Sequence, residues 1–190
     1  MNKTGETEYC RKFLIERLPE PLTTASSHLQ IFDNYIENTR FRLRSIRDPH
    51  ANVWSHVFQQ RVAIENSGRR ATKIVEMHLD EGDYKVFENY GGREQRNSGR
   101  ETRKNRYFHD FDHHAWRFDV YLGDPTGVII AAVEFASFAD SEQFEPPPFA
   151  MIEITNDEFF DGRNLITKTS DEIRSEVQRL SSMIEPMIDE

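Results

Sequence analysis

Apolar and polar residues alternate with a period of two along most of this chain, which is the pattern of strands whose two faces meet different surroundings. The pattern predicts nine strands, over residues 6–16, 29–37, 39–48, 53–64, 70–79, 101–109, 114–122, 127–137 and 150–155. Eight or nine antiparallel strands with few helices can close into a barrel, which removes exposed edges.

Helical signals are fewer than strand signals. Asp80 precedes acidic residues and predicts a short helix over 80–88, and a second short helix is expected over 137–144. The clearest helix is predicted over 169–187, where acids near the start precede apolar residues at helical spacing. That apolar stripe consists of Ile173, Val177, Leu180 and Ile184. Composition predicts turns at 48–50 and 123–127 and a flexible loop over 89–100.

Charged side chains share one face of several predicted strands. Arg42 and Arg44 lie on the face opposite Leu43, and Lys104 shares a face with Arg106. The same parity groups Arg117 with Asp119, Ala132 with Glu134, and Glu8 with Cys10 and Lys12. Two arrangements fit this alternation. The charged faces point to solvent around an apolar sandwich core, or they line a wet lumen while the apolar faces pack outward under helices.

The charge balance limits the choice of partner. The 190-residue chain has a formal net charge of −9, so we expect no long-range attraction to nucleic acid or to an anionic membrane. The basic residues are nevertheless bunched along the chain. Such bunching favours a small anionic ligand held locally, against the alternative of ordinary solvated charge. The bunches are Arg40, Arg42, Arg44 and Arg47; Arg69, Arg70 and Lys73; and Arg100, Arg103, Lys104 and Arg106.

Other features of the sequence concern location. A single cysteine, Cys10, leaves no intrachain disulfide and no multi-cysteine zinc site. No apolar stretch approaches the ~20 residues that cross a bilayer. The first residues are polar and of mixed charge, unlike a signal peptide. We therefore expect a single domain over residues 1–190 in the cytoplasm, with no membrane partner.

The segment that begins at Glu8 resembles the N-terminal signature of the CYTH (triphosphate tunnel) family, Glu-x-Glu-x-Lys followed by an apolar run. Further fragments follow in the family's order over roughly residues 6–166. These fragments are Arg42-Leu43-Arg44, Arg61, Glu76 before Leu79-Asp80-Glu81-Gly82-Asp83-Tyr84, Lys104-Asn105-Arg106-Tyr107, Asp119-Val120-Tyr121-Leu122-Gly123, Ala131-Ala132-Val133-Glu134-Phe135, and Glu153-Ile154-Thr155. The resemblance implies a mostly β (α+β) fold, a closed antiparallel eight-to-nine-stranded tunnel barrel over about 6–166, with flanking helices and a C-terminal helix over about 169–187.

The resemblance also implies roles for individual residues. A triphosphate needs several fixed cations, and Mg²⁺ or Mn²⁺ needs oxygen ligands beside them. Lys104 would orient or help deprotonate water, and Glu8 is the second candidate catalytic residue. The implied triphosphate-binding residues are Lys12, Arg40, Arg42, Arg44, Arg61, Lys104 and Arg106. The implied metal ligands are Glu8, Glu76, Asp119, Glu134 and Glu153.

Two acids of the family pattern are replaced here. Cys10 stands where the second Glu of the first motif is expected, and Ala132 stands at the first Glu of the Glu-x-Glu strand. Ile74 replaces a further acid two residues before Glu76. The remaining carboxylates are expected to hold one ion rather than two, and Glu6 is a candidate substitute ligand one strand period before Glu8.

Three functions follow from this resemblance. The first is a metal-dependent triphosphatase that acts on inorganic triphosphate or on a nucleoside or thiamine triphosphate. The second is a binding module that holds triphosphate or polyphosphate and hydrolyses it slowly. The third is an adenylate cyclase. Outside the resemblance, the acidic and histidine residues over 109–114 have the composition of a metal site, but they fall at a predicted hairpin turn, where polar residues are ordinary.

Overall fold

The computed structural model describes residues 4–64, 70–90, 101–123 and 127–184. Strands form at all nine predicted places, and their bounds differ from the predicted ones by two residues at most. The strands are β1 (Thr4–Leu14), β2 (Leu29–Tyr35), β3 (Phe41–Asp48), β4 (Val53–Ala63), β5 (Ala71–Leu79), β6 (Glu101–Phe111), β7 (His114–Leu122), β8 (Ile129–Phe135) and β9 (Ile152–Glu153).

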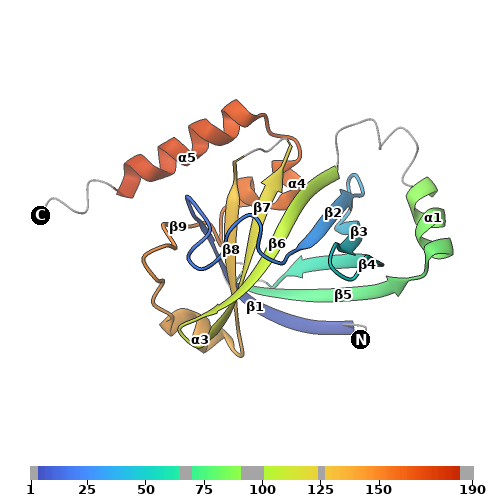
Figure 1. Ribbon diagram of the computed structural model, residues 1–190, viewed down its shortest axis with the longest axis horizontal. Helices are drawn as coiled ribbons and strands as arrows, with labels where there is room; N and C mark the ends of the chain where they lie inside the picture. The colour runs from blue at the N-terminus through green and yellow to red at the C-terminus, as the bar shows by residue number, and fades with distance from the viewer. Residues whose placement is uncertain (1–3, 65–69, 91–100, 124–126, 185–190) are drawn as a thin grey trace, which may run out of the picture.

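The strands form one antiparallel sheet in the order β5-β4-β3-β2-β6-β7-β8-β1-β9, which closes because β1 also pairs with β5. The first half of β1 pairs with β5, where Glu8 lies opposite Thr72. Its second half pairs with β8, where Cys10 lies opposite Glu134. Strands β1 to β8 therefore make a closed barrel, and the two-residue β9 pairs with the end of β1 (Figure 1). The predicted closed antiparallel barrel is confirmed.

Three helices lie close to where the sequence predicts them: α1 (Glu81–Tyr90), α3 (Phe138–Gln143) and α5 (Ser170–Ile184). Asp80 accepts the backbone N–H of Asp83 at 2.8 Å, and Ser137 accepts that of Asp140 at 3.1 Å, so each short helix begins at a side-chain cap. Residues 185–187 of the expected last helix, and the side chain of Ile184, lie outside the described part. No helix in the described ranges is long and apolar enough to cross a membrane.

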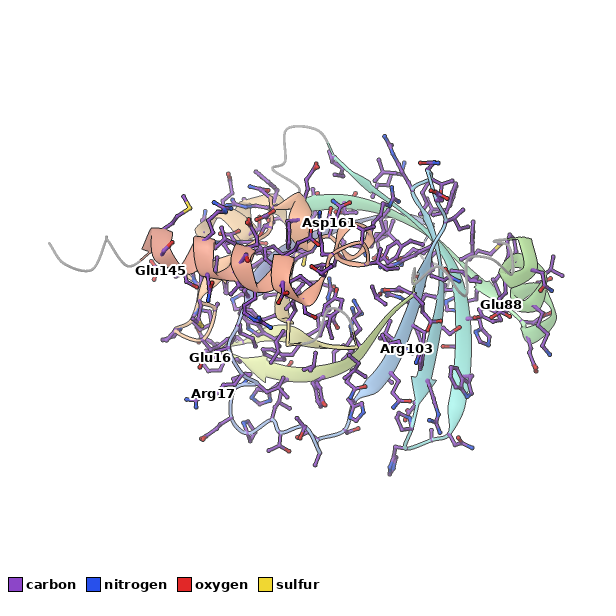
Figure 2. The ribbon with its side chains drawn as sticks, turned by 90° about the horizontal axis from the view of Figure 1, so that it is seen from above. Glu16, Arg17, Glu88, Arg103, Glu145 and Asp161 are labelled. Atoms are coloured by element: carbon purple, nitrogen blue, oxygen red, sulfur yellow. The ribbon has the colours of Figure 1, made fainter. Side chains whose placement is uncertain are left out.

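Two short helical turns were not predicted: η1 (Glu158–Phe160) and α4 (Gly162–Leu165). Each is too short to produce a helical periodicity in the sequence. Asp157 caps the first turn by accepting the N–H of Phe159 at 2.9 Å. Figures 1 and 2 show α5 and α1, which carries Glu88, at opposite ends of the molecule.

The connections between strands agree with the expected turns where the structure describes them. Between β3 and β4, the Asp48 carboxylate accepts the backbone N–H groups of His50 and Ala51 at 2.9 and 3.1 Å. Such a turn is typical of aspartate. Residues 124–126 of the turn expected at 123–127, and residues 91–100 of the loop expected at 89–100, lie outside the described part.

The apolar faces of the strands point outward, away from the barrel axis. Trp116, Phe118 and Tyr107 are almost fully buried there, because the segments after β1 and α3 pack over them. Leu18 and Phe149 belong to this cover. The charged faces consequently point inward. Of the two arrangements that alternation allows, the structure adopts the polar lumen, and burial of about 25 cal/mol per Å² of apolar surface stabilises the outer layers instead.

One part of the barrel interior is apolar. Leu14, Tyr121 and Ile130 have the lumen-facing parity of their strands, and they pack against Phe160 of η1 and Ile173 of α5. The predicted apolar stripe of the last helix thus contacts the barrel through Ile173, which is 3% exposed. This cluster bounds the polar part of the lumen, so η1, α4 and α5 cover the barrel at that place.

Candidate functional site

A cavity of about 360 Å³ occupies the barrel interior. Its walls are mainly polar because alternate residues of the surrounding strands point into it. Among the described residues, seven basic side chains line this lumen cavity, against four acidic ones. The basic residues are Lys12, Arg42, Arg44, Arg61, Lys104, Arg106 and Arg117. The acidic ones are Glu8, Glu76, Asp119 and Glu134. A protein of net charge −9 therefore has a concentrated set of cations inside its barrel.

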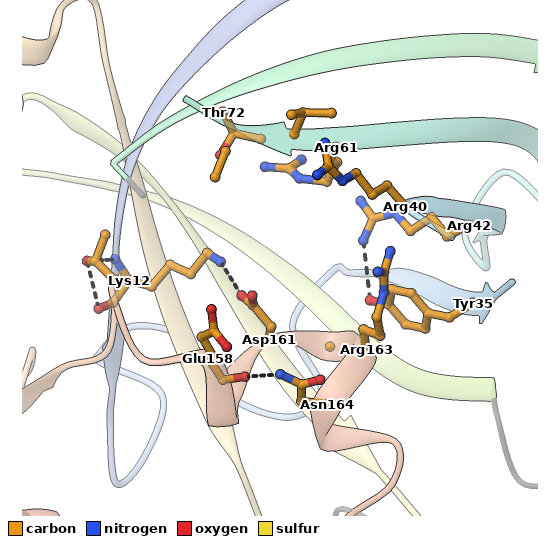
Figure 3. A pocket seen from close by; sticks show the side chains of 14 residues that line it. Lys12, Tyr35, Arg40, Arg42, Arg61, Thr72, Glu158, Asp161, Arg163 and Asn164 are labelled. Atoms are coloured by element: carbon orange, nitrogen blue, oxygen red, sulfur yellow. Dashed lines mark hydrogen bonds and ion pairs between the residues drawn. The ribbon is translucent and has the colours of Figure 1, made fainter. Parts of the chain in front are cut away.

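A second cavity, of about 530 Å³, adjoins the first (Figure 3). We call it the mouth cavity; it shares Lys12, Tyr35, Arg42, Arg61 and Gly162 with the lumen cavity. It adds the guanidinium groups of Arg40 and Arg163. In Figure 3, Arg40, Arg42 and Arg61 lie together on one wall, facing Lys12 and Asp161 across the opening. The predicted triphosphate residues are therefore all placed on two adjoining cavities.

Asp33 of β2 is the charged centre of one lumen wall, and the sequence analysis did not single it out. Its side chain is fully buried, and its carboxylate receives two hydrogen bonds from Arg44, at 2.6 and 2.7 Å. Arg42 approaches the same carboxylate at 3.3 Å and Lys104 at 3.9 Å. Burial alone would raise the pKa of Asp33, but Arg42 and Arg44 outweigh it and hold that pKa far below its usual range.

Lys104 and Arg106 share a second buried carboxylate, that of Asp119. The Lys104 Nζ lies 2.7 Å from one oxygen, and Arg106 donates to both oxygens at 2.7 and 2.8 Å. The pKa of Lys104 is lowered to about 7, mainly by burial and also by Arg106 and Arg44, while Asp119 and Asp33 oppose the change. Lys104 can therefore exchange a proton near neutral pH, which an ordinary lysine cannot.

Glu8 lies between two guanidinium groups. Its Oε1 is 2.5 Å from Arg61 Nη2 and 3.4 Å from Arg117 Nη2. Arg117 also bonds Glu134 through Nη1, and its Nη2 lies 3.6 Å from the Cys10 sulfur. Burial raises the pKa of Glu8, but Arg117 and Arg61 together bring it well below its usual range. Glu8 is therefore a carboxylate at neutral pH and is poorly suited to donate a proton.

The other two predicted metal ligands differ in position. Glu76 lines the lumen cavity, where its carboxylate accepts a 2.6 Å hydrogen bond from Gln59. Glu153 lines neither the lumen nor the mouth cavity. Arg11, on the outward face of β1, binds it through two hydrogen bonds of 2.9 and 2.5 Å. Burial raises the pKa of Glu153, but hydrogen bonds from Arg11 and Thr155 outweigh it. The structure thus separates Glu153 from the other predicted ligands.

The acids are dispersed among cations rather than gathered. Within the described ranges, no three side chains of His, Cys, Asp or Glu come close enough together to hold a metal ion. This includes 109–114, whose Asp112 and His113 form the turn between β6 and β7 with positive φ of 48° and 63°. Glu6, the possible substitute ligand, is exposed and lines neither cavity. The side chains as they stand do not form a ready metal site, and the metal roles stay predictions.

Some lumen residues were not predicted from the sequence, and one further residue was placed on the right face but given no role. Asp33 and Tyr35 alternate on one face of β2, and Gln59 precedes Arg61 by one strand period, so strand parity alone could have placed them. Arg117 was assigned to the face of Asp119 but given no role. Arg163 carried no signal, because it lies in the unpredicted α4.

The architecture is the closed antiparallel barrel that the resemblance to the CYTH family implies. A solved structure described as the inorganic triphosphatase NE1496 has the same fold, with a TM-score of 0.56 at 19% identity over 87% of this chain and 97% of that chain. A structure described as the hypothetical protein NE1496 has the same TM-score of 0.56, at 20% identity over 85% of this chain and 99% of that chain. No protein-family model and no curated protein matches the chain. At these identities the likeness establishes the fold alone.

Proposed function

We propose that this chain is a CYTH-type protein whose lumen binds a triphosphate, and that it hydrolyses a phosphoanhydride bond of that ligand. The observation that carries the proposal is the set of seven basic side chains around a 360 Å³ cavity in an acidic protein. A triphosphate carries about four negative charges, and fixed guanidinium forks match phosphate oxygens. The shared fold with a protein described as an inorganic triphosphatase supports the choice of ligand.

Arg42 lies where the two cavities meet and lines both of them, so a ligand extending from lumen to mouth would pass it. Its Nη1 donates to Asp33 and Tyr35, and its Nη2 donates to Gln59. Its Nε is buried without a partner in the described part of the chain, but so is Nε of Arg47 outside both cavities, and this nitrogen therefore carries no argument for a ligand. The position of the Arg42 charge between the two cavities supports the proposal.

A divalent ion in this lumen would depend on the lumen carboxylates for its binding. If Mg²⁺ or Mn²⁺ is used, it would neutralise charge on the phosphates and activate a water, and Glu8, Glu134, Asp119 and Glu76 are the lumen carboxylates available to it. Each of them is held by a cation or an amide in this structure. The residues therefore fit a metal poorly, which favours slow hydrolysis and keeps a triphosphate-binding module as the second candidate function.

The test is a phosphate-release screen over inorganic, nucleoside and thiamine triphosphates, with Mg²⁺, with Mn²⁺ and with chelator. Titration calorimetry with inorganic triphosphate gives binding separately from turnover. Affinity no better than for sulfate would refute the triphosphate site. Tight binding without release of phosphate would leave the binding module as the function.

Arg42→Ala is expected to weaken inorganic triphosphate binding at least tenfold, about 1.5 kcal/mol, because a charge-assisted contact in a partly buried site is lost. Arg47→Ala is the matched control. Arg47 lies on the same strand outside both cavities, where it contacts Gln30 and the ring of Trp54. Calorimetry should show a change for Arg42→Ala alone, and an equal loss in both variants would point to a general charge effect.

Triphosphate affinity is expected to fall as pH rises above about 7. Free Lys104 loses its proton there, and a bound polyanion would raise its pKa again, so binding takes up a proton. Affinity should then fall by up to about tenfold per pH unit between the pKa of Lys104 in the free protein and its higher pKa in the complex. Lys104→Arg is the control, because its side chain stays charged over this pH range. Any pH dependence of its affinity therefore comes from ionisation of the triphosphate itself. The same slope in wild type and Lys104→Arg between pH 7 and 9 would contradict this assignment.

A further inference from the structure

Arg117 of β7 bridges two carboxylates that come from different strands. Its Nη2 is 3.4 Å from Glu8 Oε1 on β1, and its Nη1 bonds Glu134 on β8. The guanidinium lies inside the lumen cavity and is mostly buried, with 16% of the side chain exposed. Glu8 and Glu134 are thus held on either side of one fixed positive charge.

The neighbouring positions leave room for this guanidinium. Cys10, whose sulfur lies 3.6 Å from Arg117 Nη2, and Ala132, which lies opposite Arg117 in the β7–β8 pairing, are both small and uncharged. Each is about 5% exposed. In the sheet, Cys10 is opposite Glu134 and Ala132 is opposite Lys12, so both lie in the same part of the barrel wall. No third carboxylate reaches the pair within the described ranges.

A divalent ion binds where carboxylate oxygens converge from opposite sides. Between Glu8 and Glu134 that position is taken by the Arg117 guanidinium, which pairs with both carboxylates, and Arg61 pairs with Glu8 as well. A divalent ion placed there would meet a cation at close range in a partly desolvated cavity, where repulsion is strong. The ion would also have to displace the two charge-assisted contacts of Arg117.

We propose that Arg117 is a built-in cation that replaces a divalent metal between Glu8 and Glu134 and presents its positive charge to the phosphates of the ligand. The presentation to phosphate rests on the proposed function; the exclusion of metal does not. Triphosphate binding in this lumen then needs no Mg²⁺ or Mn²⁺, because the charge that a metal would bring belongs to the protein.

The first experiment measures Mn²⁺ binding to the full chain without triphosphate, from the electron paramagnetic resonance signal of free Mn²⁺. Wild type is expected not to bind at millimolar Mn²⁺. Arg117→Met removes the charge that bridges Glu8 and Glu134 and leaves Arg61 as the cation on Glu8, so it should bind Mn²⁺ roughly tenfold tighter or more than wild type does. Arg103→Met is the control, since Arg103 lies on β6 (Figure 2), where its side chain is exposed and pairs with Glu101. Arg117→Lys keeps a charge and should still exclude Mn²⁺.

The second experiment titrates wild type with inorganic triphosphate in chelator and in millimolar Mg²⁺. We expect affinity in chelator to be at least as high as with Mg²⁺, and Arg117→Met to lose roughly tenfold or more in chelator, the size of a lost charge-assisted contact. If Arg117→Met does not fold, as judged by circular dichroism, the wild-type titrations and Arg117→Lys decide.

Wild-type Mn²⁺ binding that Glu8→Gln abolishes would overturn the inference. So would a wild-type affinity for triphosphate that falls tenfold or more in chelator. Failure of triphosphate to bind under every condition would instead remove the proposed function. The Mn²⁺ measurement contains no triphosphate, so it decides the metal exclusion in either case.

Discussion

Asp33→Asn is expected to lower the free energy of unfolding by about 3–5 kcal/mol, because it removes one partner of a buried ion pair and leaves the other uncompensated. Asp33 is fully buried, and Arg44, which binds it through two hydrogen bonds, has a side chain only 8% exposed. Arg42 and Lys104 also lie within 4 Å of the carboxylate. Asparagine keeps the shape but presents an N–H₂ group to these cations.

The measurement is urea unfolding at neutral pH, with Asp171→Asn as the control. Asp171 pairs with Arg174 on α5, and both side chains are largely exposed, so its loss should change stability by less than about 0.5 kcal/mol. A loss below about 1 kcal/mol for Asp33→Asn would show that water or rearrangement of Arg44 compensates the missing charge.

The same group predicts the pH dependence of stability. The pKa of Asp33 is lower in the folded protein than in the unfolded chain, so its stabilising contribution is complete above the unfolded value of about 3.9. The contribution is lost progressively as pH falls below that value toward the folded pKa. Wild type should therefore lose more stability than Asp33→Asn between pH 5 and 3. Parallel acid profiles for the two proteins would show that Asp33 does not carry this effect.

The double change Cys10→Glu with Ala132→Glu is expected to raise triphosphatase activity roughly tenfold or more and to make it depend on Mg²⁺ or Mn²⁺. Preorganised charge at a developing negative centre is typically worth 10² to 10³ in rate, and a metal supplies that charge. Both positions lie beside Arg117 in the wall between Glu8 and Glu134. New carboxylates there would pair with the guanidinium and free oxygen ligands for an ion.

Steady-state phosphate release against metal concentration checks this expectation. Cys10→Gln with Ala132→Gln is the matched control, because it adds the same volume without charge and should gain no metal dependence. Either variant could lose stability, since both positions are buried, so folding is checked by thermal unfolding first. Rapid wild-type turnover that the double change does not improve would show that the existing acids already make a competent site.

The strands could be predicted from the sequence because the alternation of apolar and polar residues is a local property of the chain. All nine strands could be predicted within two residues, and so could the start of a helix at Asp80. The short turns η1 and α4 could not, because three or four residues carry no periodicity. Two residues of the mouth cavity were therefore not predicted. They are Asp161, which approaches Lys12 at 3.5 Å, and Arg163.

Which face of each strand was interior could not be read from alternation, because a period of two treats both faces alike. The resemblance to the CYTH family suggested the lumen, and the β1–β5 pairing establishes it by closing the sheet. Closure brings Arg42 and Glu134, far apart in the chain, to one cavity. Glu153 was grouped with the lumen acids by its motif, but the end of β1 places it beside Arg11 instead.

The sequence by itself determined which residue types share a strand face: which strands carry cations, which carry acids, and that Cys10 and Ala132 add no charge. Only the tertiary structure decided how those charges pair. Asp33, Asp119 and Glu8 are each bound by two or more cations from other strands. The pairing depends on register and closure, which are set by contacts between distant segments and leave no local pattern in the chain. The pairing places Arg117 between two carboxylates, and burial among these charges lowers the pKa of Lys104 to about 7 although Asp119 and Asp33 oppose the change.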